Sequence, residues 1–231
     1  MWVELFLCLL LAHLVADFVL QTRRICEDKI ERKILSPYHY LHAAIVFLFS
    51  WLVSWNVHFW WCALIIGATH LAIDMWKSYR AEKVTWFVLD QVLHVLVIAG
   101  VSWLWCSLHK WSIPLGISAC VVASAVAVLA CWKPANIFIK LMLKHYSVNL
   151  PEERENGFNA GALIGTIERW LILIFVCLQR YDALGLLIAA KSIIRFSEKD
   201  TAKTEYVLAG TLLSIFIAML AGMMVRCSCR L

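Results

Sequence analysis

Eight ionisable side chains of two types, histidine and aspartate, recur inside apolar stretches in the first half of the sequence. They occur in AHLVADFVLQT (12–22), YHYLH (38–42), THLAID (69–74) and VTWFVLDQVLH (84–94), at spacings of three or four residues. Residues at these spacings share one face of a helix, so each set is expected to present its side chains together. The eight residues are His13, Asp17, His39, His42, His70, Asp74, Asp90 and His94.

Imidazole and carboxylate groups together suit a divalent ion such as Zn, Mn or Fe, and the eight residues are therefore candidate metal ligands. Asp17 and Asp90 are also candidate catalytic groups, each as a ligand or a general base. The amides of Gln21 and Gln91 are expected to support them from nearby positions. The alternative interpretation is structural, with the same groups holding the helices together through reciprocal hydrogen bonds.

An aspartate inside an apolar segment needs a partner. A charged residue at mid-span costs about 2.5–3.5 kcal/mol. Three unpaired aspartates would therefore cost an amount comparable with the whole stability of a domain. Mutual pairing or a bound cation offsets this cost, and both require that the segments meet at one place.

The composition indicates that these segments lie in a membrane. Of the 231 residues, 62% are hydrophobic and 16% are charged, whereas a soluble domain is about 45–50% apolar and about 25% charged. The 12 tryptophans suit membrane–water interfaces. The net charge of +5 is not accompanied by basic clusters that alternate with stacking aromatics, so nucleic-acid binding is not expected.

A helix needs roughly 20 apolar residues to cross a bilayer. We expect an all-α, polytopic integral membrane helix bundle of about eight transmembrane helices, the seventh of them short. The stretch NIFIKLMLKHY (136–146) has its lysines on one side and is expected to form an amphipathic helix at the interface. The predicted spans are 2–21, 38–55, 57–75, 84–108, 111–131, 161–179, 182–196 and 204–225.

Lysine and arginine alternate strongly between the loops. Sixteen lie in 23–38, 76–83, 132–160 and 190–203, and only four lie in the other loops and the tail. The positive-inside rule then places the sixteen in the cytoplasm and both termini outside. With this orientation, all four histidine-bearing sets lie in the cytoplasmic halves of their spans.

A second polar cluster lies in the C-terminal third, in GTIERW (165–170) and AAKSIIRF (189–196). Arg169, Lys191 and Arg195 are candidate ligands for a phosphate or a lipid headgroup, with Glu168 and Ser192 in support. In the alternative interpretation, Lys191 and Arg195 extend toward the interface and Glu168 pairs with one of them.

Several of these strings together resemble a bacterial inner-membrane family, the domain of unknown function 3307. The resemblance covers almost the whole chain, and it implies a polytopic protein of the bacterial inner membrane without implying an activity. The helices rich in histidine and aspartate are also similar, in residue types, to bacterial membrane-bound metal-dependent hydrolases. The strings that carry the family resemblance are HLVADFVLQ (13–21), DQVLH (90–94), GTIERWLILI (165–174), AAKSIIRF (189–196) and EYVLAGTLLS (205–214).

These observations predict one transmembrane domain over 1–231, with a His/Asp-bearing half (1–109) and a half that carries the ER and KSxxR cluster (110–231). The predicted function is a metal-dependent hydrolase-like site at the cytoplasmic side of the inner membrane, acting on a phosphorylated or lipid substrate. An ion- or proton-coupled transporter and a non-catalytic membrane subunit or effector are the alternatives. The expected partners are the lipid bilayer and such a substrate, and a homo-oligomer is left open.

Overall fold

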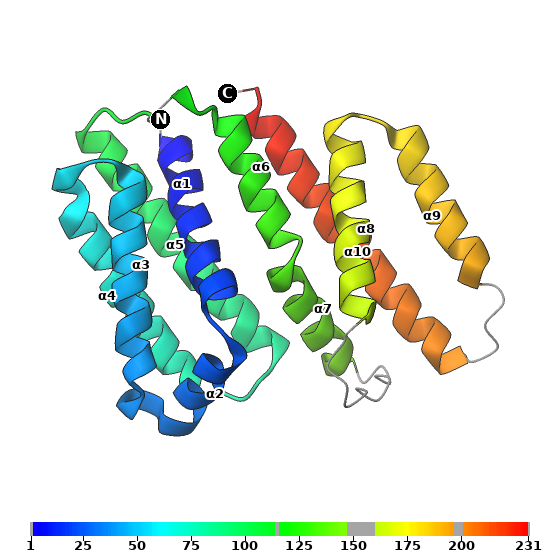
Figure 1. The fold of residues 1–231 in the computed structure, drawn as a ribbon, viewed down its shortest axis with the longest axis horizontal. Helices are drawn as coiled ribbons and strands as arrows, with labels where there is room; N and C mark the ends of the chain where they lie inside the picture. Colours follow the sequence, from blue (N-terminus) through cyan, green and yellow to red (C-terminus); the bar gives the residue numbers. More distant parts are fainter. Residues whose placement is uncertain (1, 114–115, 147–159, 196–200, 231) are drawn as a thin grey trace. The chain divides into compact units, whose positions relative to one another are not determined.

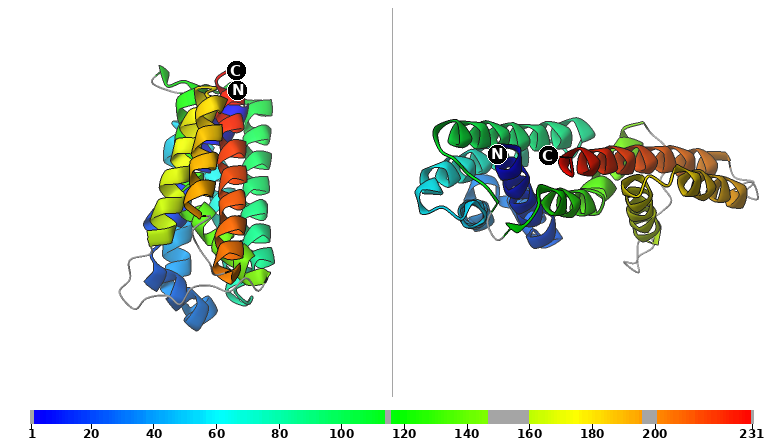
Figure 2. Two further views of the ribbon diagram at one scale, coloured as in Figure 1. Left: turned by 90° about the vertical axis from the view of Figure 1, so that its right-hand side faces the viewer. Right: turned by 90° about the horizontal axis from the view of Figure 1, so that it is seen from above.

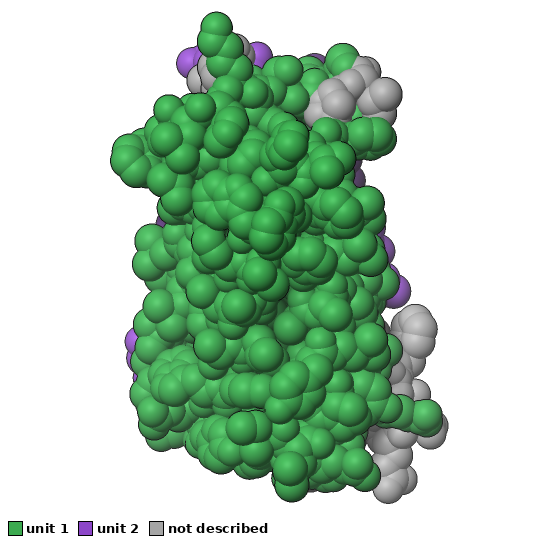
Figure 3. All heavy atoms as spheres, turned by 90° about the vertical axis from the view of Figure 1, so that its left-hand side faces the viewer, with its two compact units in different colours: residues 1–126 green, residues 127–231 purple. Residues whose placement is uncertain are grey.

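The computed structural model describes residues 2–113, 116–146, 160–195 and 201–230, with the side chains of 160, 193–195 and 201–207 excepted. Every regular element in these ranges is a helix (Figure 1), as the sequence predicted. The chain divides into two compact units, residues 1–126 and residues 127–231, which Figure 3 shows in green and purple. The single transmembrane domain over 1–231 stays a prediction.

Unit 1 is built on four long helices that run side by side (Figures 1 and 2). α1 packs against α3 and α5, and α4 packs against the same two helices, so the four close into a ring. The elements are α1 (Trp2–Leu14), a π-helix (Val15–Leu20), α2 (Arg23–Arg32), a 3₁₀ turn (Lys33–Leu35), α3 (Pro37–Ser54), a 3₁₀ turn (Val57–Phe59), α4 (Trp60–Ser78), α5 (Val84–Leu108) and α6 (Ala119–Ala130), which continues into unit 2.

Local chemistry explains where α3 begins and ends and how closely it approaches α4. Pro37 occupies the first turn, where its missing N–H costs no hydrogen bond. Trp55 ends the helix in the left-handed conformation, with φ of 49°. Gly67 of α4 faces α3 so closely that an added Cβ would lie 3.0 Å from Phe47 Cβ. Small residues permit such approaches between helices in membranes.

The first predicted span changes its winding in the middle of the His/Asp segment. Val15–Leu20 forms a π-helix, in which hydrogen bonds run from i to i+5 and each turn is wider than in an α-helix. Gln21 then leaves the helix with an extended backbone (φ −78°, ψ 112°). The predicted common face of His13, Asp17 and Gln21 is therefore wrong for Gln21, because four-residue spacing places side chains together only in regular α-helix.

Unit 2 is organised around the pairing of α8 with α10. An added Cβ at Gly222 of α10 would lie 2.6 Å from Val176 Cγ1 of α8, so these helices also approach closely. The buried core of the unit comprises Cys131, Ile172, Val176, Leu184 and Ala218. The helices are α7 (Lys133–His145), α8 (Ala160–Cys177), α9 (Tyr181–Arg195) and α10 (Thr201–Ser228).

Within the described ranges, five helical segments are long and apolar enough to cross a membrane. The protein is thus a membrane helix bundle, and the number of eight spans stays a prediction. Several boundaries differ from the predicted ones. α6 begins at Ala119 rather than at 111, and α7 follows α6 so closely that both belong to one spanning segment, so the interfacial position of α7 stays a prediction. The five segments are Trp2–Leu20, Val57–Ser78, Val84–Leu108, Ala119–His145 and Leu208–Ser228.

Candidate metal centre

The carboxylate of Asp17 lies among three imidazoles that come from α1, α3 and α4. Its Oδ1 is 3.7 Å from His13 Nδ1, 3.2 Å from His42 Nε2 and 3.5 Å from His70 Nε2. The three imidazole residues are buried, and the Asp17 side chain is 8% exposed. Donor atoms in a tetrahedral zinc site with bonds of about 2.0–2.1 Å lie roughly 3.3 Å apart. The spacing around Asp17 is thus close to that of a metal ligand shell.

Three overlapping groups of residues in unit 1 could hold a metal ion, because the ligand atoms within each group lie within 4.8 Å of one another. Together they contain seven of the eight predicted ligands and draw on all four long helices. Each is named here after one member. The His13 triad is His13, Asp17 and His70; the His42 triad is His42, His70 and Asp74; the Asp90 triad is Asp74, Asp90 and His94.

Neighbouring groups determine which nitrogen carries the lone pair in two of the histidines. His94 Nδ1 lies 2.9 Å from the backbone oxygen of Asp90, which can only accept, so Nδ1 carries the proton and Nε2 the lone pair. The Gln91 amide donates from Nε2 to Asp90 Oδ2 over 3.0 Å. Its Oε1 therefore accepts from His13 Nε2 over 3.4 Å, which leaves the lone pair on His13 Nδ1, the nitrogen that faces Asp17.

Several of these ligand atoms have no hydrogen-bond partner within the described parts of the chain. They include His13 Nδ1, His70 Nε2 and His94 Nε2, all buried. Leaving a buried polar atom unsatisfied costs about 1–3 kcal/mol, and the lone pair of His13 Nδ1 faces the Asp17 carboxylate, which repels it. A divalent cation coordinated by these nitrogens and carboxylates would remove both costs, so the donor set fits the predicted ion.

Two lysines that were not predicted as site residues neutralise two of the aspartates. Lys29 Nζ donates to Asp74 Oδ2 over 2.6 Å, and Lys77 Nζ donates to Asp90 Oδ2 over 2.5 Å. Asp17, in contrast, is surrounded by histidines. The charge on Asp17 is therefore the one that a bound cation would compensate most directly.

The position of Lys29 follows from the way α2 covers the end of the bundle (Figure 1). Lys33, one turn further on, donates to the backbone oxygen of Ser78 at the end of α4 over 2.5 Å. Lys29 and Lys33 are four residues apart, as are Asp74 and Ser78, so the two segments meet in register. Because Lys33 bonds to a backbone oxygen, which every residue carries, the spacing alone does not identify Lys29 as a site residue.

Two of the residues predicted for this centre, His39 and Gln21, belong to none of the triads. His39 is 1% exposed and belongs to none of them, although both its ring nitrogens lack a hydrogen-bond partner in the described structure. Gln21 ends the π-helix and forms no hydrogen bond with the triads. Gln91, the other predicted supporting amide, does lie in the cluster and bonds to His13 and Asp90.

The guanidinium of Arg169 in unit 2 is enclosed by protein oxygens. Nε donates to the backbone oxygen of Cys131 (2.6 Å) and Nη1 to Ser214 Oγ (3.1 Å). Nη2 donates to Asn136 Oδ1 (2.5 Å) and Thr166 Oγ1 (3.1 Å). With four of its five N–H groups bonded internally, Arg169 has little left to offer an anion, and these contacts favour a structural role over the predicted ligand role.

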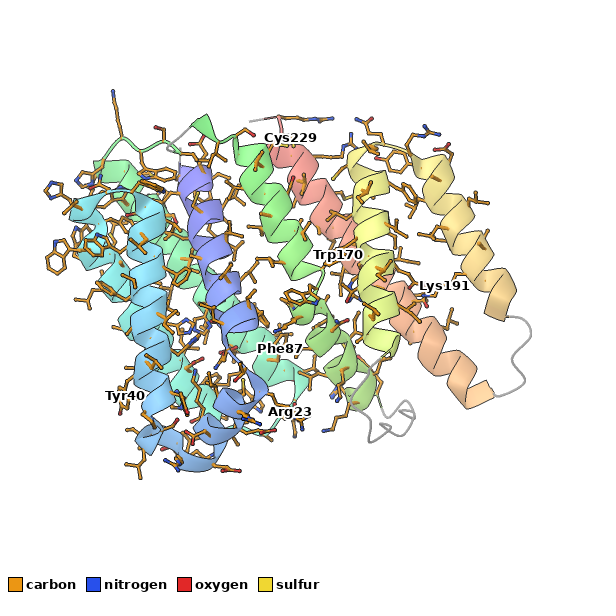
Figure 4. The ribbon with its side chains drawn as sticks, in the orientation of Figure 1. Arg23, Tyr40, Phe87, Trp170, Lys191 and Cys229 are labelled. Atoms are coloured by element: carbon orange, nitrogen blue, oxygen red, sulfur yellow. The ribbon has the colours of Figure 1, made fainter. Side chains whose placement is uncertain are left out.

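Lys191 and Glu168 form the ion pair that the alternative interpretation of this cluster predicted. Lys191 of α9, labelled in Figure 4, forms an ion pair with Glu168 of α8. The hydroxyl of Ser192 donates to the backbone oxygen of Ile188 in its own helix over 2.9 Å. The side chain of Arg195 lies outside the described residues.

Comparison with known families returned one match, to the model described as Protein of unknown function (DUF3307), over residues 5–122. Comparisons with curated proteins and with solved structures returned no match. The matched residues include all eight predicted metal ligands, whereas the resemblance in the C-terminal third lies outside them, and the similarity to metal-dependent hydrolases stays a prediction. Since the match spans half of the chain, this protein belongs to the DUF3307 family of proteins of unknown function.

Proposed function

We propose that the His13 triad binds a divalent transition-metal ion and that the protein is a metal-dependent membrane hydrolase. The single observation that carries this proposal is that two buried imidazole nitrogens beside the Asp17 carboxylate, His13 Nδ1 and His70 Nε2, have no hydrogen-bond partner among the described residues. Reciprocal hydrogen bonds, the structural alternative, would leave no ring nitrogen without a partner. The proposed ion supplies the missing partner.

A divalent ion held at this place would lower the pKa of a bound water and polarise a phosphoryl or acyl oxygen. In this proposal His13, Asp17 and His70 hold the ion, and Gln91 fixes the imidazole of His13. Lys29 and Lys77 pair with the neighbouring carboxylates of Asp74 and Asp90. The proposed substrate is a phosphorylated or lipid molecule that reaches the cytoplasmic face of the inner membrane.

Elemental analysis of purified protein tests the proposal. Wild type should retain stoichiometric Zn, Mn or Fe, and Asp17→Asn should lose it. Asp182→Asn is the matched control, because Asp182 is an exposed aspartate that pairs with Arg180. Metal-free wild-type protein after incubation with each ion, or full retention by Asp17→Asn, would contradict the proposal.

The metal-loaded protein can then be tested for hydrolysis of chromogenic phosphate and carboxylate esters.

The second candidate function is ion transport. His70 Nε2 lies 3.5 Å from Asp17 and 3.9 Å from Asp74, which places ionisable groups in a chain of the kind that conducts protons or ions. Ion flux into proteoliposomes without ester hydrolysis would favour the transporter over the hydrolase.

A further inference from the structure

The Asp90 triad forms a second potential cation position that shares no residue with the His13 triad. Each triad brings three ligand atoms within 4.8 Å of one another. The first triad offers two imidazoles and one carboxylate, and the second offers two carboxylates and one imidazole. The centre therefore contains a complete set of three ligands for each of two ions.

Buried atoms without partners mark this second position independently of its acidity. Asp90 is fully buried, and its Oδ1 has no hydrogen-bond partner among the described residues. The same holds for His94 Nε2, which carries the lone pair because Nδ1 donates to a backbone oxygen. A carboxylate oxygen and an imidazole nitrogen are thus both available to a ligand.

Lys29 and Lys77 bond to the carboxylates of Asp74 and Asp90 without occupying Asp90 Oδ1 or His94 Nε2. Lys77 and Gln91 both bond to Oδ2 of Asp90, so Oδ1 stays open. Lys29 bonds to Oδ2 of Asp74. Contacts of this kind orient metal ligands from outside and are common around bound metals.

The two positions are adjacent, because His70 lies between them. Its Nε2 is 3.5 Å from Asp17 Oδ1 in the first triad and 3.9 Å from Asp74 Oδ2, which belongs to the second. Ions in two-metal sites lie about 3.5–4 Å apart. The contacts of His70 with a carboxylate of each triad place the two ligand sets side by side, as such a site requires.

We infer that the centre binds two divalent cations and that its substrate is a phosphate ester. Asp74, Asp90 and His94 hold the second cation. This inference rests on the proposed function. Three carboxylates and two lysines carry a net charge of minus one. One divalent ion raises this charge to plus one, and two ions raise it to plus three. A phosphate dianion between two cations compensates the larger charge, as in the two-metal sites of phosphatases.

Titration of metal-free, detergent-solubilised protein with Mn²⁺ tests the inference. Stoichiometry comes from calorimetry, and electron paramagnetic resonance reports whether the bound ions lie close enough to couple. Wild type and the control Asp182→Asn should bind two ions per chain and give a coupled signal. Asp90→Asn should bind one ion and give the uncoupled six-line signal, because it removes a ligand of the second ion only.

The outcomes separate the inference from the proposed function. One ion in wild type overturns the inference and leaves the proposed function standing, whereas no bound ion overturns both. Two coupled ions in Asp90→Asn also overturn the inference. If Asp90→Asn is not monodisperse in detergent, His94→Gln takes its place with the same expected loss of one ion.

Discussion

At the scale of single residues, the chemistry of the centre depends on which nitrogen of each imidazole carries its lone pair. His94 is set by a backbone oxygen, and His13 is set by the amide of Gln91. The sequence placed histidine and aspartate on common helix faces, and seven of the eight predicted ligands meet in the triads. It could not predict the tautomers or the two lysine partners, because these depend on side-chain conformations and on contacts between distant segments.

Replacing Gln91 with leucine tests the role of this amide. The substitution keeps the size of the side chain but removes the group that fixes the proton of His13 on Nε2. We expect metal affinity to fall about 10- to 100-fold, the usual effect of losing a partner that orients a metal ligand. Competition with a chelator measures the affinity. The control is Gln21→Leu, and equal affinity in the two variants would contradict the role assigned to Gln91.

At the scale of elements, the predicted spans correspond to helices, while several boundaries and one winding differ. Hydrophobic length predicted α5 at 84–108, the bounds that the structure shows. The predicted start of this span at 111 was wrong because Trp111, Ile113 and Ile117 continue the hydrophobic pattern without forming helix. The π-helix at Val15–Leu20 was not predicted, since apolar periodicity over six residues does not distinguish the two windings.

The close packing of α3 against α4 should be sensitive to one added methyl group. In Gly67→Ala the new Cβ would lie 3.0 Å from Phe47 Cβ and 3.3 Å from the backbone oxygen of Ala43. Overpacking of this kind costs about 1–3 kcal/mol, so the melting temperature in detergent should fall. Metal affinity should fall as well, because α3 and α4 carry His42 and His70.

The matched control is Gly100→Ala in α5, where an added Cβ meets nothing within 4 Å. Alanine is the better helix former, so this variant should melt at or slightly above the wild-type temperature. Equal melting temperatures for the two alanine variants would show that the contact at Gly67 does not limit helix packing.

Arg169 should stabilise unit 2 without affecting the metal centre. Arg169→Met leaves the buried backbone oxygen of Cys131 without this donor, at about 1–3 kcal/mol for an unsatisfied buried group, and also removes the donor to the half-buried Asn136. A lower melting temperature with unchanged metal content is expected, while Arg180→Met, at an exposed ion pair, should behave as wild type. A variant that melts as wild type but loses affinity for inorganic phosphate would restore the predicted anion-binding role.

At the scale of the whole molecule, the charge pattern predicts the orientation in the membrane. Sixteen of the lysines and arginines lie in alternate loops that the positive-inside rule assigns to the cytoplasm. An external protease should therefore remove an epitope tag at the C-terminus in right-side-out vesicles. A tag inserted between residues 80 and 83 should be protected. The reverse pattern would place the metal centre near the outer face and contradict a cytoplasmic substrate.

In the proposed centre, helices α1, α3, α4 and α5 together supply imidazole and carboxylate ligands to a metal ion. X-ray absorption spectroscopy of the zinc-loaded protein tests it most directly, because it identifies the atoms bound to the ion. We expect nitrogen and oxygen neighbours at about 2.0–2.2 Å, with the multiple-scattering pattern of at least two imidazoles. A first shell of cysteine sulfur at about 2.3 Å, or of oxygen without imidazole, would contradict it.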